Sequence, residues 1–165
     1  MKWRLNRSLR GQTKPSEVTI ENFDQYQIYG FFRNPLDRFL SLVRYAQQEF
    51  TKFEKFNTDA GMSADEIKLL TYDQFFDNFS KFNSFVPFYF DPQVEWIANA
   101  NLLDFNNYNA EILRVARLLD ITQVEIAKHN WTENSEEQPL QKVIDFVQSY
   151  YADDYRLGRE RGLLA

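Results

Sequence analysis

The segment FFRNPLDRFLS at residues 31–41 places the strongest constraint on how this chain folds. Its first two residues end a largely apolar run over residues 26–32, which stops at Arg33. Asn34 and Pro35 then have the residue types of a helix N-cap and a first helical position. Apolar residues occupy both faces of the run, as in a strand buried in a parallel sheet. The sequence therefore predicts a buried strand over residues 26–32 that turns directly into a helix.

The helix expected over residues 35–53 is amphipathic. Its apolar stripe has the spacing of a core-facing helix side and comprises Leu36, Phe39, Leu40, Val43, Ala46 and Phe50. Arg38 and Ser41 lie on the other face, towards the side of Arg33. A cationic turn at a helix N-terminus favours an anion, because free N–H groups and the helix dipole both attract negative charge. The alternative is an ordinary strand-to-helix corner in which Arg33 pairs with a carboxylate.

Composition narrows the chemistry of the chain. At 165 residues it has the size of one domain with a sizeable core. The lack of cysteine excludes disulfides and cysteine-ligated zinc, and a single histidine excludes a histidine cluster, so we expect no metal site. No apolar run has the length of a membrane span and the N-terminus lacks a signal-peptide core. We therefore expect a cytoplasmic protein without a membrane partner.

Charge is distributed unevenly along the sequence. The first fourteen residues hold five basic residues and no acidic one. The rest of the chain holds all 24 acidic residues against 14 basic ones. We interpret residues 1–16 as a solvated basic arm. The acidic body argues against a nucleic-acid partner, because phosphate backbones attract basic surfaces.

Two helix starts are marked by capping boxes, in which a Ser or Thr is followed three residues later by Glu or Gln. They are Ser63 with Glu66 and Thr71 with Gln74. The residues before the first box, 57–63, are expected to form a loop.

The remaining pattern predicts mostly helices and few strands. The expected elements are short strands over residues 18–20 and 102–105, helices over 72–82, 91–96, 109–119 and 139–152, a polar loop over 128–139 and a charged C-terminal tail. Phenylalanines at helical spacing in the 72–82 helix are typical of a core. We therefore expect an α/β fold with a small parallel sheet in predominantly helical surroundings.

The segment around Arg33 resembles the 3′-phosphate-binding segment of sulfotransferases that use 3′-phosphoadenosine 5′-phosphosulfate (PAPS), most closely the carbohydrate-type enzymes of family 2. Their pattern is an apolar strand, Arg, any residue, Pro, two more residues, Arg, and a Ser on the next turn. Here those positions are Arg33, Pro35, Arg38 and Ser41. The resemblance implies that Arg33, Ser41 and Arg38 bind the cosubstrate PAPS, or its product adenosine 3′,5′-bisphosphate (PAP).

Weaker similarities follow in the family's order over residues 22–158. They are Pro92-Gln93 with Trp96, Leu103-Asp104-Phe105, Leu119-Asp120-Ile121, His129-Asn130, and Tyr151 with Asp154-Tyr155. Together they imply one sulfotransferase-like domain over residues 1–165, with a reduced form of the P-loop-NTPase-like sulfotransferase fold.

Two departures from the family pattern bear on catalysis. Sulfotransferases hold the 5′-phosphosulfate in a loop near the N-terminus, and the nearest imitation here, residues 10–14, lacks a preceding strand and is followed by Pro15. Asn106 stands where the family usually has Glu. The pattern identifies no catalytic residue, and His129 is the candidate base, because only its side chain has an ordinary pKa near neutrality. The alternative for His129 is a solvated loop histidine.

Three functions follow as hypotheses. The first is a protein that binds PAPS and, if catalytically complete, transfers sulfate to a hydroxyl of a glycan or small molecule. The second is a non-catalytic remnant that acts as a nucleotide-binding or protein-interaction module. A P-loop kinase is disfavoured, because no Walker-type loop with its Lys is present. We expect little or no sulfate transfer, and self-association into a homo-oligomer, because a sheet edge beside residues 26–32 would lack its usual cover.

Overall fold

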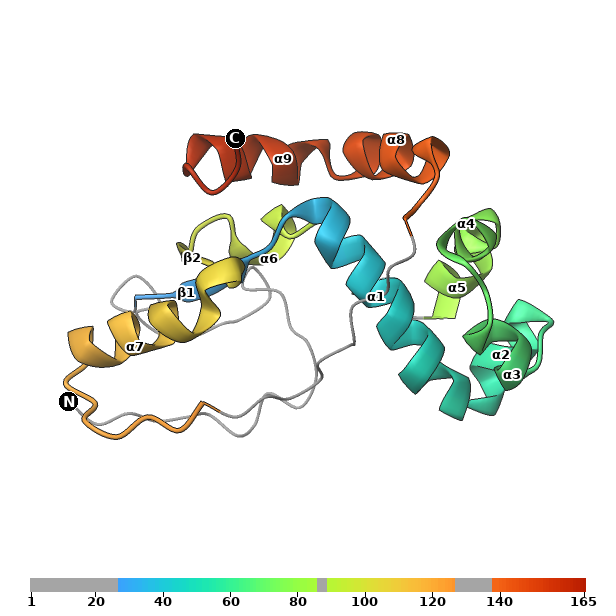
Figure 1. Cartoon of the computed structure of the whole chain (residues 1–165), viewed down its shortest axis with the longest axis horizontal. Helices are drawn as coiled ribbons and strands as arrows, with labels where there is room; N and C mark the ends of the chain where they lie inside the picture. Colours follow the sequence, from blue (N-terminus) through green and yellow to red (C-terminus); the bar gives the residue numbers. More distant parts are fainter. Residues whose placement is uncertain (1–26, 86–88, 127–137) are drawn as a thin grey trace, which may run out of the picture.

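A computed structural model describes residues 27–85, 89–126 and 138–165. Within them a small two-stranded parallel sheet lies towards one end of a predominantly helical structure (Figure 1). The elements are β1 (Tyr29–Phe32), α1 (Pro35–Glu49), α2 (Glu54–Ala60), α3 (Ala64–Lys68), α4 (Tyr72–Asp77), α5 (Phe79–Phe85), α6 (Val94–Ile97), β2 (Asn101–Asp104), α7 (Tyr108–Leu118), α8 (Gln141–Tyr150) and α9 (Ala152–Glu160), with short 3₁₀ turns at Phe50–Lys52 and Phe105–Asn107. This arrangement agrees with the expected small parallel sheet in helical surroundings. The strand expected over residues 18–20 and most of the polar loop, 128–137, lie outside the described residues.

The two strands pair in parallel, with Phe31 opposite Leu103. β1 is shorter than the expected run of 26–32, whose first residue lies outside the described residues. β2 ends one residue earlier than expected, because the side chain of Asp104 accepts a hydrogen bond from the N–H of Asn106 at 2.9 Å and starts a 3₁₀ turn.

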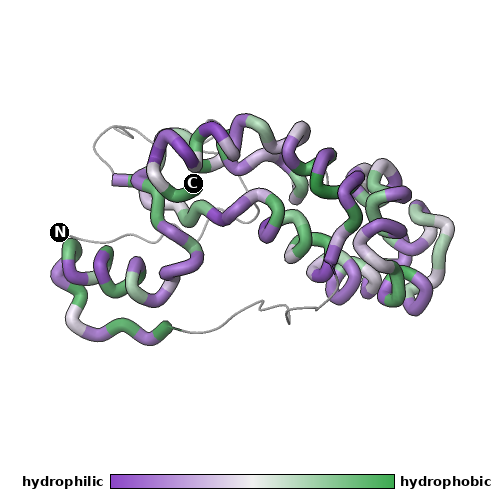
Figure 2. Tube along the Cα trace, turned by 45° about the horizontal axis from the view of Figure 1, so that its top comes forward, coloured by the Kyte–Doolittle hydropathy of each residue, from purple (hydrophilic) through white to green (hydrophobic). Residues whose placement is uncertain are grey.

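α1 begins as the sequence predicts. The side chain of Asn34 accepts a hydrogen bond from the N–H of Leu36 at 2.9 Å, and Pro35 occupies the first turn. The regular helix ends at Glu49 rather than at residue 53, and the chain continues as a 3₁₀ turn. Hydrophobic and hydrophilic residues alternate along the helical parts of the trace (Figure 2). Most of the predicted stripe is buried, namely Phe39, Val43, Ala46 and Phe50.

The prediction of a loop over residues 57–63 is wrong, because residues 54–60 form α2. Phe56 and Ala60, four residues apart, are both buried and hold this short helix against the core. Gly61 ends the helix in the left-handed conformation, with φ of 67°, which is accessible to glycine at little cost. Its position is therefore a helix C-terminus.

Both predicted capping boxes are present, and they start α3 and α4. The N–H of Glu66 donates to the hydroxyl of Ser63 at 3.2 Å, and the N–H of Ser63 donates to the Glu66 carboxylate at 2.7 Å. The aromatic helix expected over residues 72–82 is divided into α4 and α5 at Asn78.

The prediction of a charged tail after residue 152 is wrong, because this segment forms α9. One side of α9 is buried, and this side includes Asp154, Leu157 and Gly158. α8 packs against α1, and α9 packs against α6 close to the sheet (Figure 1). The C-terminal helices α8 and α9 therefore extend from α1 and α4 to the region of the sheet (Figure 1).

The core consists mainly of aromatic rings between α1, α2, α4, α5 and α8. Phe39 is fully buried at its centre, within 6.4 Å of the rings of Phe79, Phe90, Phe146 and Tyr151. The predicted core role of the aromatic residues in α4 and α5 is therefore confirmed. None of the helices in the described residues combines the length and apolar character needed to cross a membrane.

Candidate functional site

Arg33 directly follows β1, and its main chain is held on both sides by one side chain. The N–H of Arg33 donates to Oε1 of Gln93 at 3.0 Å, and Nε2 of Gln93 donates to the carbonyl oxygen of Arg33 at 2.8 Å. Gln93 is buried and directly precedes α6. Its amide therefore takes the place of a strand neighbour for the residue that leaves the sheet.

Gln93 is held in turn by Asp154 on α9. The Asp154 carboxylate, which is completely buried, accepts hydrogen bonds from the N–H groups of Gln93 at 2.8 Å and Val94 at 2.7 Å. Burial raises the pKa of Asp154, while these main-chain donors and the nearby Arg38 act in the opposite direction. A carboxylate thus satisfies the first N–H groups of α6, which otherwise have no partner within that helix.

The side chain of Arg33 extends over an aromatic ring. Its guanidinium carbon lies 4.9 Å from the centroid of the Phe105 ring, within the range of a cation–π contact. Burial lowers the pKa of Arg33, Asp37 raises it, and Arg44 and Arg38 lower it further. Among the described residues, none forms a salt bridge with Arg33. In this part of the chain the guanidinium therefore has no salt-bridge partner, although Asp37 lies close enough to raise its pKa.

Further aromatic rings support Phe105. Phe31 stacks on Tyr108, with ring centroids 4.6 Å apart, and meets Phe105 edge to face at 6.3 Å. All three rings are half-buried. Because packed rings have few alternative rotamers, they fix the surface on which the Arg33 guanidinium rests.

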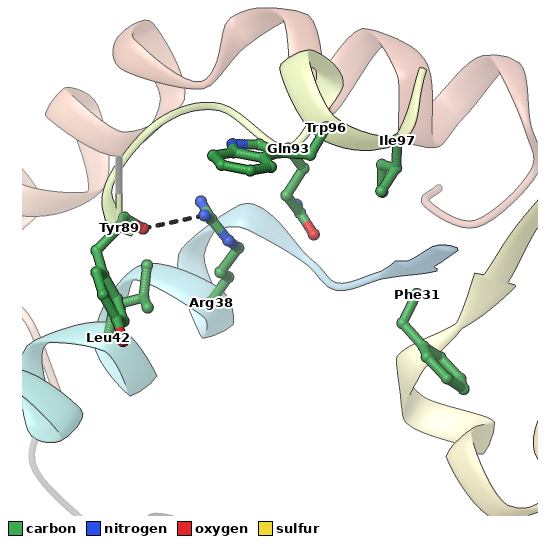
Figure 3. Close-up of a pocket in the computed structure, with 7 residues that line it drawn as sticks. All are labelled: Phe31, Arg38, Leu42, Tyr89, Gln93, Trp96 and Ile97. Atoms are coloured by element: carbon green, nitrogen blue, oxygen red, sulfur yellow. Dashed lines mark hydrogen bonds between the residues drawn. The ribbon is translucent and has the colours of Figure 1, made fainter. Parts of the chain in front are cut away.

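A pocket of about 260 Å³ opens between β1, α1 and α6, and it contains Arg38. Figure 3 shows its lining residues, Phe31, Arg38, Leu42, Tyr89, Gln93, Trp96 and Ile97. Nη2 of Arg38 donates to the carbonyl oxygen of Tyr89 at 3.1 Å, and the guanidinium lies 5.7 Å from the Tyr151 ring. Arg38 is thus engaged with protein groups before α6 and at the junction of α8 and α9.

The predicted site residues do not converge on that pocket. Neither Arg33 nor Ser41 is among its described lining residues. Ser41 lies on α1, one turn after Arg38, and is half-buried. His129 and residues 10–14, the candidate base and the candidate loop, lie outside the described residues. In the described part of the chain no group of His, Asp or Glu side chains is arranged to hold a metal ion.

Gln93 and Asp154 are functional candidates that the site prediction did not include. A signal for Asp154 exists in the sequence, because it shares a helical face with Tyr151 and Leu157, both of which are buried. An acidic residue on an apolar helix face needs buried donors. Gln93 is marked in the sequence only by the weak family similarity of Pro92-Gln93 with Trp96, and its partner Arg33 lies 60 residues away.

The site offers a cation fixed at the end of a parallel strand and at the N-terminus of a long helix. Such a group suits an anionic ligand with several oxygen acceptors. No family model, no curated protein sequence and no solved structure matches this chain. No relative therefore indicates what the site binds, and its ligand is inferred from its own residues and their arrangement.

Proposed function

We propose that this chain binds a nucleotide that carries a 3′-phosphate, such as PAPS or PAP, through Arg33 and Ser41. One observation carries the proposal: the Arg33 main chain is held on both sides, while its guanidinium lacks a salt bridge within the described residues. A charged group that is already positioned gives up little conformational freedom on binding. Its planar fork matches two phosphate oxygens.

The local charge supports an anionic ligand. Arg38 and Arg44 are close enough to Arg33 to lower its pKa, and Asp37 is the one acidic residue that opposes them there. The positive end of the α1 dipole lies at the same turn. A phosphate at Arg33 would reduce the repulsion among these three arginines.

The order of residues along β1 and α1 supports the same assignment. Arg33, Pro35, Arg38 and Ser41 have the spacing of the sulfotransferase 3′-phosphate segment, and β1 and β2 are parallel, with a helix after each. We therefore propose a reduced P-loop-NTPase-like sulfotransferase fold. The hydroxyl acceptor of a complete enzyme stays open.

Binding without catalysis is the second candidate. Sulfate transfer needs donors on the leaving phosphate, which sulfotransferases supply from a loop between a strand and a helix. The described glycines, Gly30, Gly61, Gly158 and Gly162, do not lie in such a loop. The candidate loop at residues 10–14 lies outside the described residues, so a nucleotide-binding module stays the alternative to a complete transferase.

Calorimetric titration with PAP tests the binding proposal, with adenosine 5′-phosphate as the ligand that lacks the 3′-phosphate. We expect PAP to bind more tightly, and Arg33→Ala to weaken PAP binding by about tenfold or more, as the loss of a charge-assisted contact predicts. Arg117→Ala, in the last turn of α7, is the matched control and should leave the affinity unchanged. Equal affinity for the two nucleotides, or no effect of Arg33→Ala, would contradict the proposal.

A turnover assay with PAPS and a panel of hydroxyl acceptors separates the two candidates. We expect sulfate transfer at or below the detection limit, because the loss of even one leaving-group donor costs about a hundredfold in rate. Robust transfer would show that the chain is a complete sulfotransferase and would exclude the binding-only alternative.

A further inference from the structure

Gln93 holds both the N–H and the carbonyl group of Arg33, and so fixes the point from which the Arg33 side chain extends. We propose that Gln93 is a positioning residue for the Arg33 guanidinium, and that Asp154 acts through Gln93 to keep it in place. The inference rests on the proposed function, because it concerns how Arg33 reaches a 3′-phosphate. It adds two residues, from α6 and α9, to a site otherwise formed by β1 and α1.

The two hydrogen bonds between Gln93 and Arg33 run in opposite directions. One fixes the N–H of Arg33 at 3.0 Å and the other fixes its carbonyl oxygen at 2.8 Å. A single bond would hold only one of the two peptide groups that flank the Cα of Arg33, whereas two bonds from one planar amide hold both of them. The Cα of Arg33, and with it the origin of the side chain, is therefore set by Gln93.

The Gln93 amide has one favourable orientation. Its Nε2 faces the Arg33 carbonyl oxygen and lies 3.5 Å from the Asp154 carboxylate. A flipped amide would place Oε1 against these two acceptors and leave the N–H of Arg33 facing a second donor. Asp154 thus determines which way the amide points, in addition to holding the Gln93 main chain at 2.8 Å.

Neighbouring contacts immobilise the segment that carries Gln93. The hydroxyl of Tyr151 donates to the carbonyl oxygen of Phe90 at 2.9 Å, and Arg38 donates to that of Tyr89 at 3.1 Å. Both donors belong to rigid parts of the fold, next to α9 and on α1. Gln93 is therefore held in place by several contacts, and a small shift of its side chain would also shift Arg33.

The test is a double-mutant cycle on PAP affinity with Arg33→Ala and Gln93→Met. Methionine has nearly the length of glutamine but makes neither hydrogen bond. We expect Gln93→Met to weaken PAP binding by about tenfold in the wild-type background. In the Arg33→Ala background it should change the affinity by less than about twofold, because coupled residues are not additive. Affinity for adenosine 5′-phosphate should be the same with and without Gln93→Met.

Gln47→Met is the matched control for lost stability. Nε2 of Gln47 donates to the carbonyl oxygens of Ile67 at 3.1 Å and Leu70 at 2.8 Å, so this change also removes two side-chain hydrogen bonds, at the far end of α1. It should lower the Tm without changing PAP affinity. Weakened PAP binding in Gln47→Met of the same size as in Gln93→Met would show a general structural effect and overturn the positioning role.

Asp154→Asn provides a second route if Gln93→Met does not fold. It keeps the side-chain volume but turns one acceptor into a donor, so the support of Gln93 is weakened rather than removed. We expect a smaller loss of PAP affinity that also disappears in the Arg33→Ala background. If Arg33→Ala weakens binding while neither Gln93→Met nor Asp154→Asn does, the inference fails and the proposed function stands. Absence of PAP binding by the wild-type protein would overturn both.

Discussion

Gly30 of β1 lies directly against Ile97 of α6: a Cβ added to Gly30 would come within 2.7 Å of Cγ2 of Ile97 and 3.0 Å of its Cβ. A real Cβ atom does not approach carbon this closely. The absence of a side chain at position 30 therefore sets the distance between the sheet and α6. That distance in turn places Gln93, which directly precedes α6, within hydrogen-bond reach of Arg33.

Gly30→Ala should lower the free energy of unfolding by about 1–3 kcal/mol, because overpacking forces β1 and α6 apart. Combining it with Ile97→Ala, which removes the Cγ2 atom in conflict, should recover part of this loss. Urea denaturation of the two single variants and the double variant measures the coupling. Fully additive effects would mean that Gly30 and Ile97 do not limit the approach of the two elements.

Tyr151→Phe should lower the free energy of unfolding by about 1–2 kcal/mol. The Tyr151 hydroxyl is buried and donates to the carbonyl oxygen of Phe90, which would be left without this donor. Tyr29→Phe is the matched control, because the Tyr29 hydroxyl donates to the exposed Gln27 side chain, where water can replace it. Equal unfolding midpoints for the two variants in urea would contradict the expectation.

Asp154 should make stability depend on pH in a definite direction. Burial raises its pKa in the folded state above the ordinary 3.8. Between the unfolded and the folded pKa the folded state binds more protons, so the free energy of unfolding falls as pH rises through this window. The quantity to measure is the difference in unfolding free energy between the wild type and Asp154→Asn, from acid to neutral pH. It should decrease with rising pH, and a flat or increasing difference would contradict the assigned direction.

We also expect the isolated chain to self-associate. Within the described residues each strand of the sheet has one edge without a partner strand, and such edges readily pair with another chain. Apolar side chains of α7 and the residues after it, Leu113, Leu118 and Ile121, are exposed nearby. Light scattering should give a mass that rises with protein concentration. A constant monomer mass over the accessible range would contradict this expectation.

Local features of the fold could be predicted from the sequence because they depend on residues two to four positions apart. The capping boxes at Ser63 and Thr71, the start of α1 at Asn34 and the extent of α7 are of this kind. The failures have a different cause. α2 is helical because Phe56 is buried in the core, a tertiary contact that composition does not show.

The candidate site divides in the same way. Arg33 is identifiable because strand, cationic residue and capped helix are contiguous in sequence. The residues that position Arg33 could not be identified in this way, because Gln93 and Asp154 lie 61 residues apart and come into contact only in the folded chain. A glutamine after a proline has the composition of an exposed turn, and α9 has the composition of a charged tail.

The parallel pairing of β1 with β2 has a consequence for the order in which the molecule assembles. The side chain of Asn101 donates to the carbonyl oxygen of Ile28, 73 residues away, so the sheet closes a long loop. The helices from α1 to α5 contact near neighbours in sequence, so we expect these contacts to form early in folding. We expect the strands, α6 and α9 to come together later, because their contacts join residues far apart in the sequence. If Arg33 binds a nucleotide as proposed, release of α9 would remove the Asp154 support of Gln93 and weaken that binding, and a bound nucleotide would in turn stabilise the packing of β1, α6 and α9.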